Sequence, residues 1–192
     1  MIPELVWYVA YGSNLCAARF SCYLAGGAPP GASRNYPGCR DRRPVRGSIP
    51  VTLPGTLYFA GESSVWTGGM ALYDHRTPGP TCGRGYLITA EQFADVAAQE
   101  MHRAPGEFLD LAPVLANGRH EFGRGRYETV LLVGEYDGHP MVTFTAPDRA
   151  ADVAHTTPSA AYLRMLATGI AETLDWTDDQ IDRYLTGALS GD

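Results

Sequence analysis

Residues 6–15 have the sequence VWYVAYGSNL, and this stretch decides how the chain begins to fold. Val6 to Ala10 form a short apolar run of residue types that favour β-structure. The run stops at Gly12-Ser13-Asn14, and the residues that follow are rich in Leu, Ala and Arg. They predict a helix over about residues 15–24, with Ser13 or Asn14 as its N-cap. The chain is therefore expected to open with a strand, a tight loop and a helix.

Further strands are predicted from short apolar runs separated by turn residues. The last two of them are joined through Asp137-Gly138, which is a strong hairpin signal. The predicted strands cover residues 56–59, 70–73, 85–88, 127–136 and 141–145.

Three more helices are predicted, and their start signals are clear. Thr89 and Gln92 have the spacing of a capping box for a helix from about 90 to 101. A second helix is expected to begin at Pro158, and Thr177 with Gln180 caps the last one. Short strands with segregated helices predict an α+β fold with a small, mixed, barrel-like β-sheet and flanking helices.

The segment from Gly26 to Gly55 has a different composition. It contains six prolines and five arginines with several glycines, which argues against regular structure. Long loops in compact domains are usually functional or disordered. We therefore predict an insertion or lid at about residues 26–55 within a single domain covering residues 1–192.

The overall composition limits the classes of function. The chain has 192 residues, of which 45% are hydrophobic and 19% are charged, as in an ordinary globular protein. The formal net charge is −6 and there is no long basic run, so nucleic acid is not an expected partner. We find no secretory signal and no apolar run of membrane-spanning length, so we expect a cytoplasmic protein without a membrane partner. The oligomeric state is not indicated.

No pattern in the sequence indicates a metal or a cofactor. The four cysteines contain no C-x-x-C pair and are expected to be reduced, since a catalytic thiol would need a partner histidine. The five histidines are scattered, without an H-x-x-x-H or H-x-E pair. A G-x-S-x-G elbow and a P-loop are also missing. We therefore predict no metal site and no cofactor.

One carboxylate falls on the apolar face of a predicted helix. At 100° per residue Phe93, Val96 and Ala97 define that face of helix 90–101, and Glu100 lies inside the same arc. A carboxylate there must be paired, protonated or in a cavity, and burial favours the protonated form that general acid–base catalysis uses. The alternative is a Glu at a helix end that reaches water or pairs with an Arg.

The loop Tyr11-Gly12-Ser13-Asn14 is a second candidate. Backbone N–H groups at the start of a helix lack internal partners and carry the positive end of the helix dipole. They can bind a carboxylate or an oxyanion, and Gly12 allows the backbone to approach a ligand closely. The same residues are also common in structural turns.

Four segments in this order resemble the gamma-glutamylcyclotransferase family. YVAYGSNL at residues 8–15 looks like that family's opening strand and substrate loop, and WTGGMA at residues 66–71 is similar to its W-x-G-G-x-A segment. Gln99-Glu100 ends a helix where the family carries its catalytic glutamate, and PSAAY at residues 158–162 resembles its P-S-x-x-Y motif. Together the four segments span most of the chain.

The resemblance implies a fold, a reaction and a set of site residues. In the family reaction the free α-amine of a gamma-glutamyl group attacks its own γ-carbonyl, which releases 5-oxoproline and an amine. The partner would then be a small gamma-glutamyl amine or peptide, and the reaction needs no metal or cofactor. The residues implied are Glu100 for proton transfer, Tyr11, Gly12, Ser13 and Asn14 for substrate binding, and Tyr127 and Tyr162 for the pocket.

Several alternatives remain open at the level of the sequence. Phe144 stands where some family members have a pocket tyrosine, and the 26–55 segment is longer than the family's usual connection. A related gamma-glutamyl amide cleavage or acyl transfer in specialised metabolism would release free glutamate or form a new amide. A non-catalytic ligand-binding module would keep the loop without turnover. A zinc-dependent deacetylase is a third alternative, for which no ligand set is visible.

Overall fold

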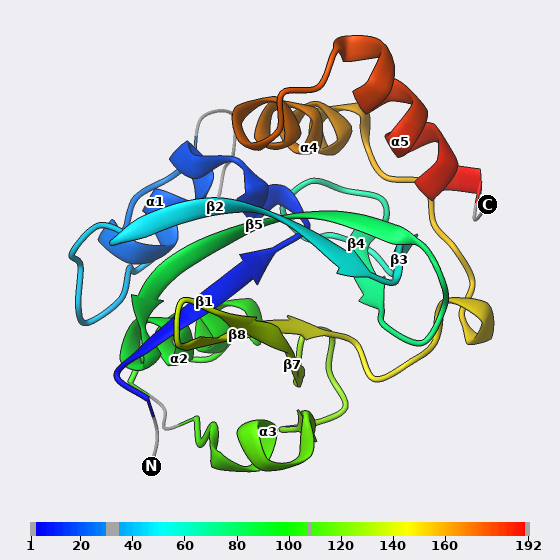
Figure 1. Ribbon diagram of the computed structural model, residues 1–192. Coiled ribbons are helices and arrows are strands. Elements are labelled where there is room, and N and C mark those ends of the chain that lie inside the picture. The colour runs from blue at the N-terminus through cyan, green and yellow to red at the C-terminus, as the bar shows by residue number, and fades with distance from the viewer. Residues whose placement is uncertain (1–2, 30–34, 107–108, 191–192) are drawn as a thin grey trace.

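The computed structural model describes residues 3–29, 35–106 and 109–190. Its centre is a six-stranded sheet with helices on both faces (Figure 1). β1 (Leu5–Ala10) pairs antiparallel with β5 (Pro80–Thr89) and parallel with β8 (His139–Thr145). The predicted α+β class with a mixed sheet is confirmed.

The sheet does not close into a barrel. Its strand order is β2-β5-β1-β8-β7-β6, so β2 (Gly47–Pro54) and β6 (Arg119–Glu121) form its two edges. Among the described residues, no pairing joins these two edges. The barrel-like closure expected from the sequence is therefore wrong, while β7 (Thr129–Tyr136) and β8 form the expected hairpin. Asp137 and Gly138 at its turn have φ values of 50° and 72°, as a tight hairpin turn requires.

The two faces of the sheet follow from the alternation of side chains along β1. Val6, Tyr8 and Ala10 belong to a core on one face, together with residues of α1 (Ala17–Ala25), α2 (Ala90–Glu100) and α3 (Ala112–Asn117). Trp7 and Val9 belong to a core on the other face. That second core is closed by α4 (Ala160–Thr173), α5 (Asp178–Ser190) and the separate hairpin of β3 (Thr56–Ala60) and β4 (Met70–Asp74). Figure 1 shows α4 and α5 across the sheet from α2 and α3.

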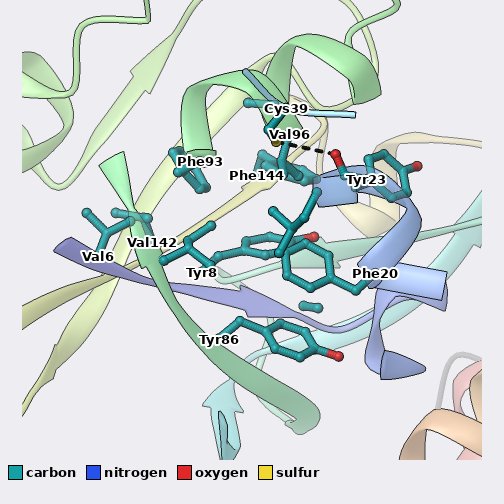
Figure 2. Packing of buried hydrophobic residues seen from close by; sticks show 14 of the residues in the cluster. Val6, Tyr8, Phe20, Tyr23, Cys39, Tyr86, Phe93, Val96, Val142 and Phe144 are labelled. Atoms are coloured by element: carbon teal, nitrogen blue, oxygen red, sulfur yellow. Dashed lines mark hydrogen bonds between the residues drawn. The ribbon is translucent and has the colours of Figure 1, made fainter. Parts of the chain in front are cut away.

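Aromatic rings fill the core beneath α1 and α2 (Figure 2). The Tyr8 ring lies 5.1 Å from the Phe144 ring and 5.3 Å from the Phe20 ring, measured between centroids. Phe93, Val96 and Ala97 are fully buried there, so the predicted apolar face of α2 is confirmed. This packing fixes the end of α2 relative to the end of β1.

The prediction of no regular structure in residues 26–55 is wrong for β2. Eight residues of that segment pair with β5, including Pro50 and Pro54. Proline removes a hydrogen-bond donor, and an edge strand tolerates this because one side of it has no partner strand. Residues 36–43 of the same segment lie along α2 and reach the side chains of Gln92 and Asp95. Residues 30–34 lie outside the described part of the chain.

The other elements differ from the sequence prediction mainly at their ends. The 3-10 helix η1 (Ser13–Leu15) precedes α1, whose N-cap is Cys16, so the prediction of Ser13 or Asn14 as that N-cap is wrong. α4 begins at Ala160, because Ser159 caps it by accepting a hydrogen bond from the Tyr162 N–H. The structure adds β6, α3 and the short 3-10 helix η2 (Ala150–Asp152), which were not predicted. No described helix combines the length and apolar character needed to cross a membrane.

Candidate active site

The loop after β1 is held rigidly by its neighbours. The Leu15 N–H donates to the Gly12 carbonyl at 2.9 Å, which closes the turn of η1. The Tyr86 hydroxyl donates to the Asn14 carbonyl at 2.8 Å. A Cβ atom at Gly169 in α4 would lie 2.5 Å from the Leu15 Cβ atom, so only glycine lets α4 pack this closely against the loop. The position of the loop is therefore fixed from two sides.

Glu100, the last residue of α2, contacts this loop directly. The Asn14 Nδ2 atom donates to Glu100 Oε1 at 3.0 Å, and it lies 3.2 Å from the Tyr8 hydroxyl. Glu100 is partly buried, and within the described part of the chain no arginine or histidine forms an ion pair with it. Among the described residues, the Glu100 carboxylate therefore forms no structural salt bridge.

Glu100 and the loop line one cavity with an empty volume of about 710 Å³, its open mouth included. All the residues that the sequence analysis singled out for the site lie on its wall: Tyr11, Gly12, Ser13, Asn14, Glu100, Tyr127 and Tyr162. They come from the loop after β1 with η1, the end of α2, the turn before β7 and the first turn of α4. Phe144 is also on the wall.

The three tyrosines hold the wall together through their hydroxyl groups. Tyr11 donates to the Phe144 carbonyl at 2.8 Å, and Tyr127 donates to the Ala71 carbonyl at 2.9 Å. The Tyr162 hydroxyl accepts from the Ala71 N–H at 3.3 Å. Burial raises the pKa of Tyr11 and Tyr162, so both phenols are neutral at neutral pH. A Cβ atom at Gly12 would approach the Tyr162 hydroxyl to 3.3 Å, which leaves little room for a larger residue.

Arg19 is a wall residue that the sequence analysis did not single out. It is only 4% exposed, and its Nε atom donates to the Ser13 hydroxyl at 2.7 Å. Its Nη2 atom donates to the hydroxyls of Tyr36 at 2.9 Å and Tyr23 at 3.3 Å. Burial alone would lower the pKa of the guanidinium, but nearby Tyr23, Tyr36 and Glu100 raise it above its usual value. Arg19 therefore carries a permanent positive charge at the cavity wall.

The signal for Arg19 was present in the sequence but ambiguous. It lies four residues before Tyr23, on the side of α1 that the structure buries. An arginine on a short amphipathic helix is more often exposed to solvent, and the sequence does not show which side faces a cavity.

The described residues contain no group of three or more His, Cys, Asp or Glu side chains that could hold a metal ion. The four cysteines are free thiols, as predicted. Burial raises the pKa of the Cys39 thiol to about 12, so this cysteine is unreactive at neutral pH.

Comparison with known proteins gives the fold. No family model matches the sequence. Two solved structures each align with 95% of this chain. One is an uncharacterized protein from Homo sapiens, with a TM-score of 0.56, 17% identity and 88% of its own chain covered. The other is a gamma-glutamyl cyclotransferase, with a TM-score of 0.55, 16% identity and 87% of its own chain covered. The chain has the gamma-glutamyl cyclotransferase-like fold that the four sequence segments implied.

One relative found by sequence comparison is named for a different activity. Histone deacetylase 5 of Arabidopsis thaliana is 29% identical over 203 residues, an alignment that covers 96% of this chain and 31% of the deacetylase. The chain therefore spans about a third of that relative's length. The name describes that whole protein, and the alignment concerns one part of it.

Proposed function

We propose that this chain catalyses an intramolecular acyl transfer on a gamma-glutamyl amine or peptide, releasing 5-oxoproline and the free amine. The observation that supports this most directly is the contact of the Glu100 carboxylate with Asn14, on the wall of a cavity in a gamma-glutamyl cyclotransferase-like fold. The deacetylase activity in the relative's name is not carried over, because the alignment covers 31% of that protein.

In this proposal the cavity first folds the substrate. Ring closure joins the α-nitrogen to the γ-carbonyl carbon of the same molecule, so no second reactant has to be bound. Holding two reacting groups in contact supplies on the order of 7–11 kcal/mol in well-oriented cases. The three tyrosines of the wall would provide a rigid, neutral surface for this folded chain.

Glu100 then moves the protons. As a carboxylate it takes a proton from the α-ammonium group, which frees the nitrogen lone pair for attack on the γ-carbonyl. The new C–N bond forms, Glu100 returns the proton to the leaving nitrogen, and the bond to that nitrogen breaks. The attacking nitrogen also loses its second proton, which the released amine takes up, so the amine leaves as an ammonium ion and the charges balance. Backbone N–H groups of the 11–14 loop would stabilise the developing oxyanion.

A product assay tests the proposal. The protein is incubated with a panel of gamma-glutamyl amines and peptides, and products are identified by mass, with Glu100→Gln as the control enzyme. We expect 5-oxoproline and free amine in equal amounts from the unmodified chain only. Free glutamate would instead indicate hydrolysis, and a new gamma-glutamyl amide would indicate transfer to another amine. Binding without any product would indicate a ligand-binding module, and each of these three results overturns the proposed reaction.

A further inference from the structure

Three buried polar atoms on the cavity wall lack a hydrogen-bond partner among the described residues. They are two donors, Arg19 Nη1 and Trp66 Nε1, and one acceptor, Asn14 Oδ1. A buried donor or acceptor without a partner is costly, and native structures rarely keep one without a reason. Because all three lie on one wall, we expect a bound molecule to supply the missing hydrogen-bond partners.

The two donors are neighbours. The Arg19 guanidinium carbon lies 5.3 Å from the centre of the Trp66 ring, and the rings of Tyr23 and Tyr36 also lie close to this guanidinium, at 5.5 Å each. The other guanidinium nitrogens are held by Ser13, Tyr23 and Tyr36, so the group cannot swing away from its position. A fixed, desolvated cation with both N–H groups of Nη1 unused and an indole N–H nearby matches the needs of a carboxylate.

The acceptor lies beside Glu100. Asn14 Nδ2 donates to the Glu100 carboxylate, and this bond fixes the orientation of the amide, with Oδ1 on its other side. A carboxylate and an amide oxygen together suit an ammonium group, which has three donors and no acceptor.

Neighbouring residues of η1 hold the two subsites. Arg19 is bound to Ser13, and Glu100 is bound to Asn14, the next residue of η1. Arg19 and Glu100 line the same cavity, and Glu100 is near enough to raise the pKa of Arg19. A cationic and an anionic group on one cavity wall match a small ligand that carries both a carboxylate and an ammonium group.

We propose that Arg19, together with the Trp66 N–H, binds the α-carboxylate of the substrate, while Glu100 and Asn14 Oδ1 hold its α-ammonium group. This rests on the proposed function and makes it more specific. The site would recognise the free α-amino acid head group of the gamma-glutamyl moiety, and it would reject substrates with an amidated or esterified α-carboxylate. The backbone N–H groups of the 11–14 loop would remain available for the oxyanion that develops at the γ-carbonyl.

The experiment measures the preference for a carboxylate in binding, separately from turnover. Calorimetry compares 5-oxoproline with its primary amide on the full chain and on Arg19→Gln, Arg19→Lys and Trp66→Phe. Charge-assisted hydrogen bonds are strong, so the unmodified chain should prefer the acid on the order of ten- to a hundredfold. Arg19→Gln should abolish this preference, while Arg19→Lys should restore part of it and Trp66→Phe should weaken it.

Arg84→Gln is the matched control. Arg84 also lies over a tyrosine ring, 5.1 Å from the centre of Tyr86, but its guanidinium is bound by Ser48, the Leu15 carbonyl and Glu172, and it is not on the cavity wall. This variant should keep the preference for the acid.

The outcomes separate the two proposals. An unchanged preference in Arg19→Gln, in a protein that still produces 5-oxoproline, overturns the role of Arg19 and leaves the proposed function intact. A chain that neither binds nor produces 5-oxoproline overturns the proposed function itself. Should Arg19→Gln fail to fold, an unchanged preference in both Arg19→Lys and Trp66→Phe overturns the inference.

Discussion

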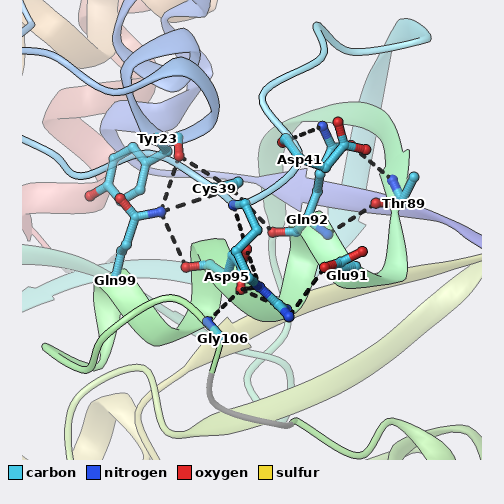
Figure 3. Close-up of polar contacts among 10 residues, drawn as sticks. Tyr23, Cys39, Asp41, Thr89, Glu91, Gln92, Asp95, Gln99 and Gly106 are labelled. Atoms are coloured by element: carbon cyan, nitrogen blue, oxygen red, sulfur yellow. Dashed lines mark hydrogen bonds and ion pairs between the residues drawn. The ribbon is translucent and has the colours of Figure 1, made fainter.

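Two carboxylates of α2, one in the middle of the helix and one at its C-terminal end, have opposite surroundings. Asp95, in the middle of the helix, has no exposed side-chain surface and accepts hydrogen bonds from the Arg40 N–H at 2.8 Å, the Arg40 guanidinium at 3.1 Å and the Gly106 N–H at 2.8 Å (Figure 3). Glu100, five residues later, has one partner among the described residues, the Asn14 amide. The same helix therefore carries one carboxylate that is fully satisfied and one that is still available.

This difference separates the side chains that hold α2 in place from the side chain proposed to react. Gln92 also holds α2 in place, because its Nε2 atom donates to the carbonyls of Asp41 at 3.1 Å and Arg43 at 2.8 Å. These bonds fasten the helix to residues 36–43 along its outer side, as Figure 3 shows for Asp41 and Gln92. The helix end at the cavity then needs no ion pair of its own to stay in place.

Replacing Glu100 should give the largest effect. Glu100→Gln keeps the contact with Asn14 possible but removes the proton acceptor, so we expect kcat to fall on the order of 10²- to 10⁴-fold. The melting temperature and the binding of 5-oxoproline should change little, since Glu100 supports no ion pair in the described structure. Steady-state kinetics with calorimetry checks this, and a fully active, folded Glu100→Gln protein contradicts the assignment.

Replacing Asp95 should lower stability and leave activity almost unchanged. Asp95→Asn removes a buried charge and weakens several hydrogen bonds with Arg40, so we expect a loss of about 2 kcal/mol in the free energy of unfolding. At a temperature where the variant is folded, kcat should stay within a few-fold of the original value. Glu91→Gln is the matched control, because Glu91 is the half-exposed partner of the same arginine at 3.2 Å. Urea unfolding of the three proteins measures the difference, and equal stability of both variants would remove the supporting role of Asp95.

The sequence predicted the supported parts of this arrangement well. The capping box of Thr89 and Gln92, the apolar face of α2 and the hairpin at residues 137–138 depend on neighbours within a few residues, and such local signals are readable without a fold. The position of Glu100 followed from helical periodicity, and its meeting with the loop followed from the family resemblance.

Features that depend on topology were missed. β2 contains two prolines, and only its place at the edge of the sheet makes them acceptable. Arg19 has the sequence context of an exposed helical arginine, and its burial results from Tyr36 and Trp66, which lie far from it along the chain. The open sheet differs from the expected barrel because closure depends on edge pairing, which no local pattern encodes.

Removing the single partner of Glu100 should give a smaller effect. Asn14→Leu retains the approximate volume but takes away the hydrogen bond of 3.0 Å and the Oδ1 acceptor proposed for the α-ammonium group. We therefore expect kcat to fall at least tenfold, since one hydrogen bond contributes roughly 1.4 kcal/mol. Tyr8→Phe is the control, since it removes the hydroxyl that lies 3.2 Å from Asn14 Nδ2 and keeps the hydrogen bond between Asn14 and Glu100. A larger kinetic effect for Tyr8→Phe than for Asn14→Leu would contradict the importance of the hydrogen bond between Asn14 and Glu100.

The helix start should give the smallest effect. The Thr89 hydroxyl accepts from the Gln92 N–H at 3.0 Å, and the Gln92 side chain accepts from the Thr89 N–H at 3.0 Å. Thr89→Ala removes half of this box, which costs about 1 kcal/mol for a typical N-cap. Thr89→Ser should retain most of the stability, because serine supplies the same acceptor. If Thr89→Ala instead lowered kcat as strongly as it lowered stability, the two ends of α2 would be coupled, and the separation of support from chemistry along this helix would not hold.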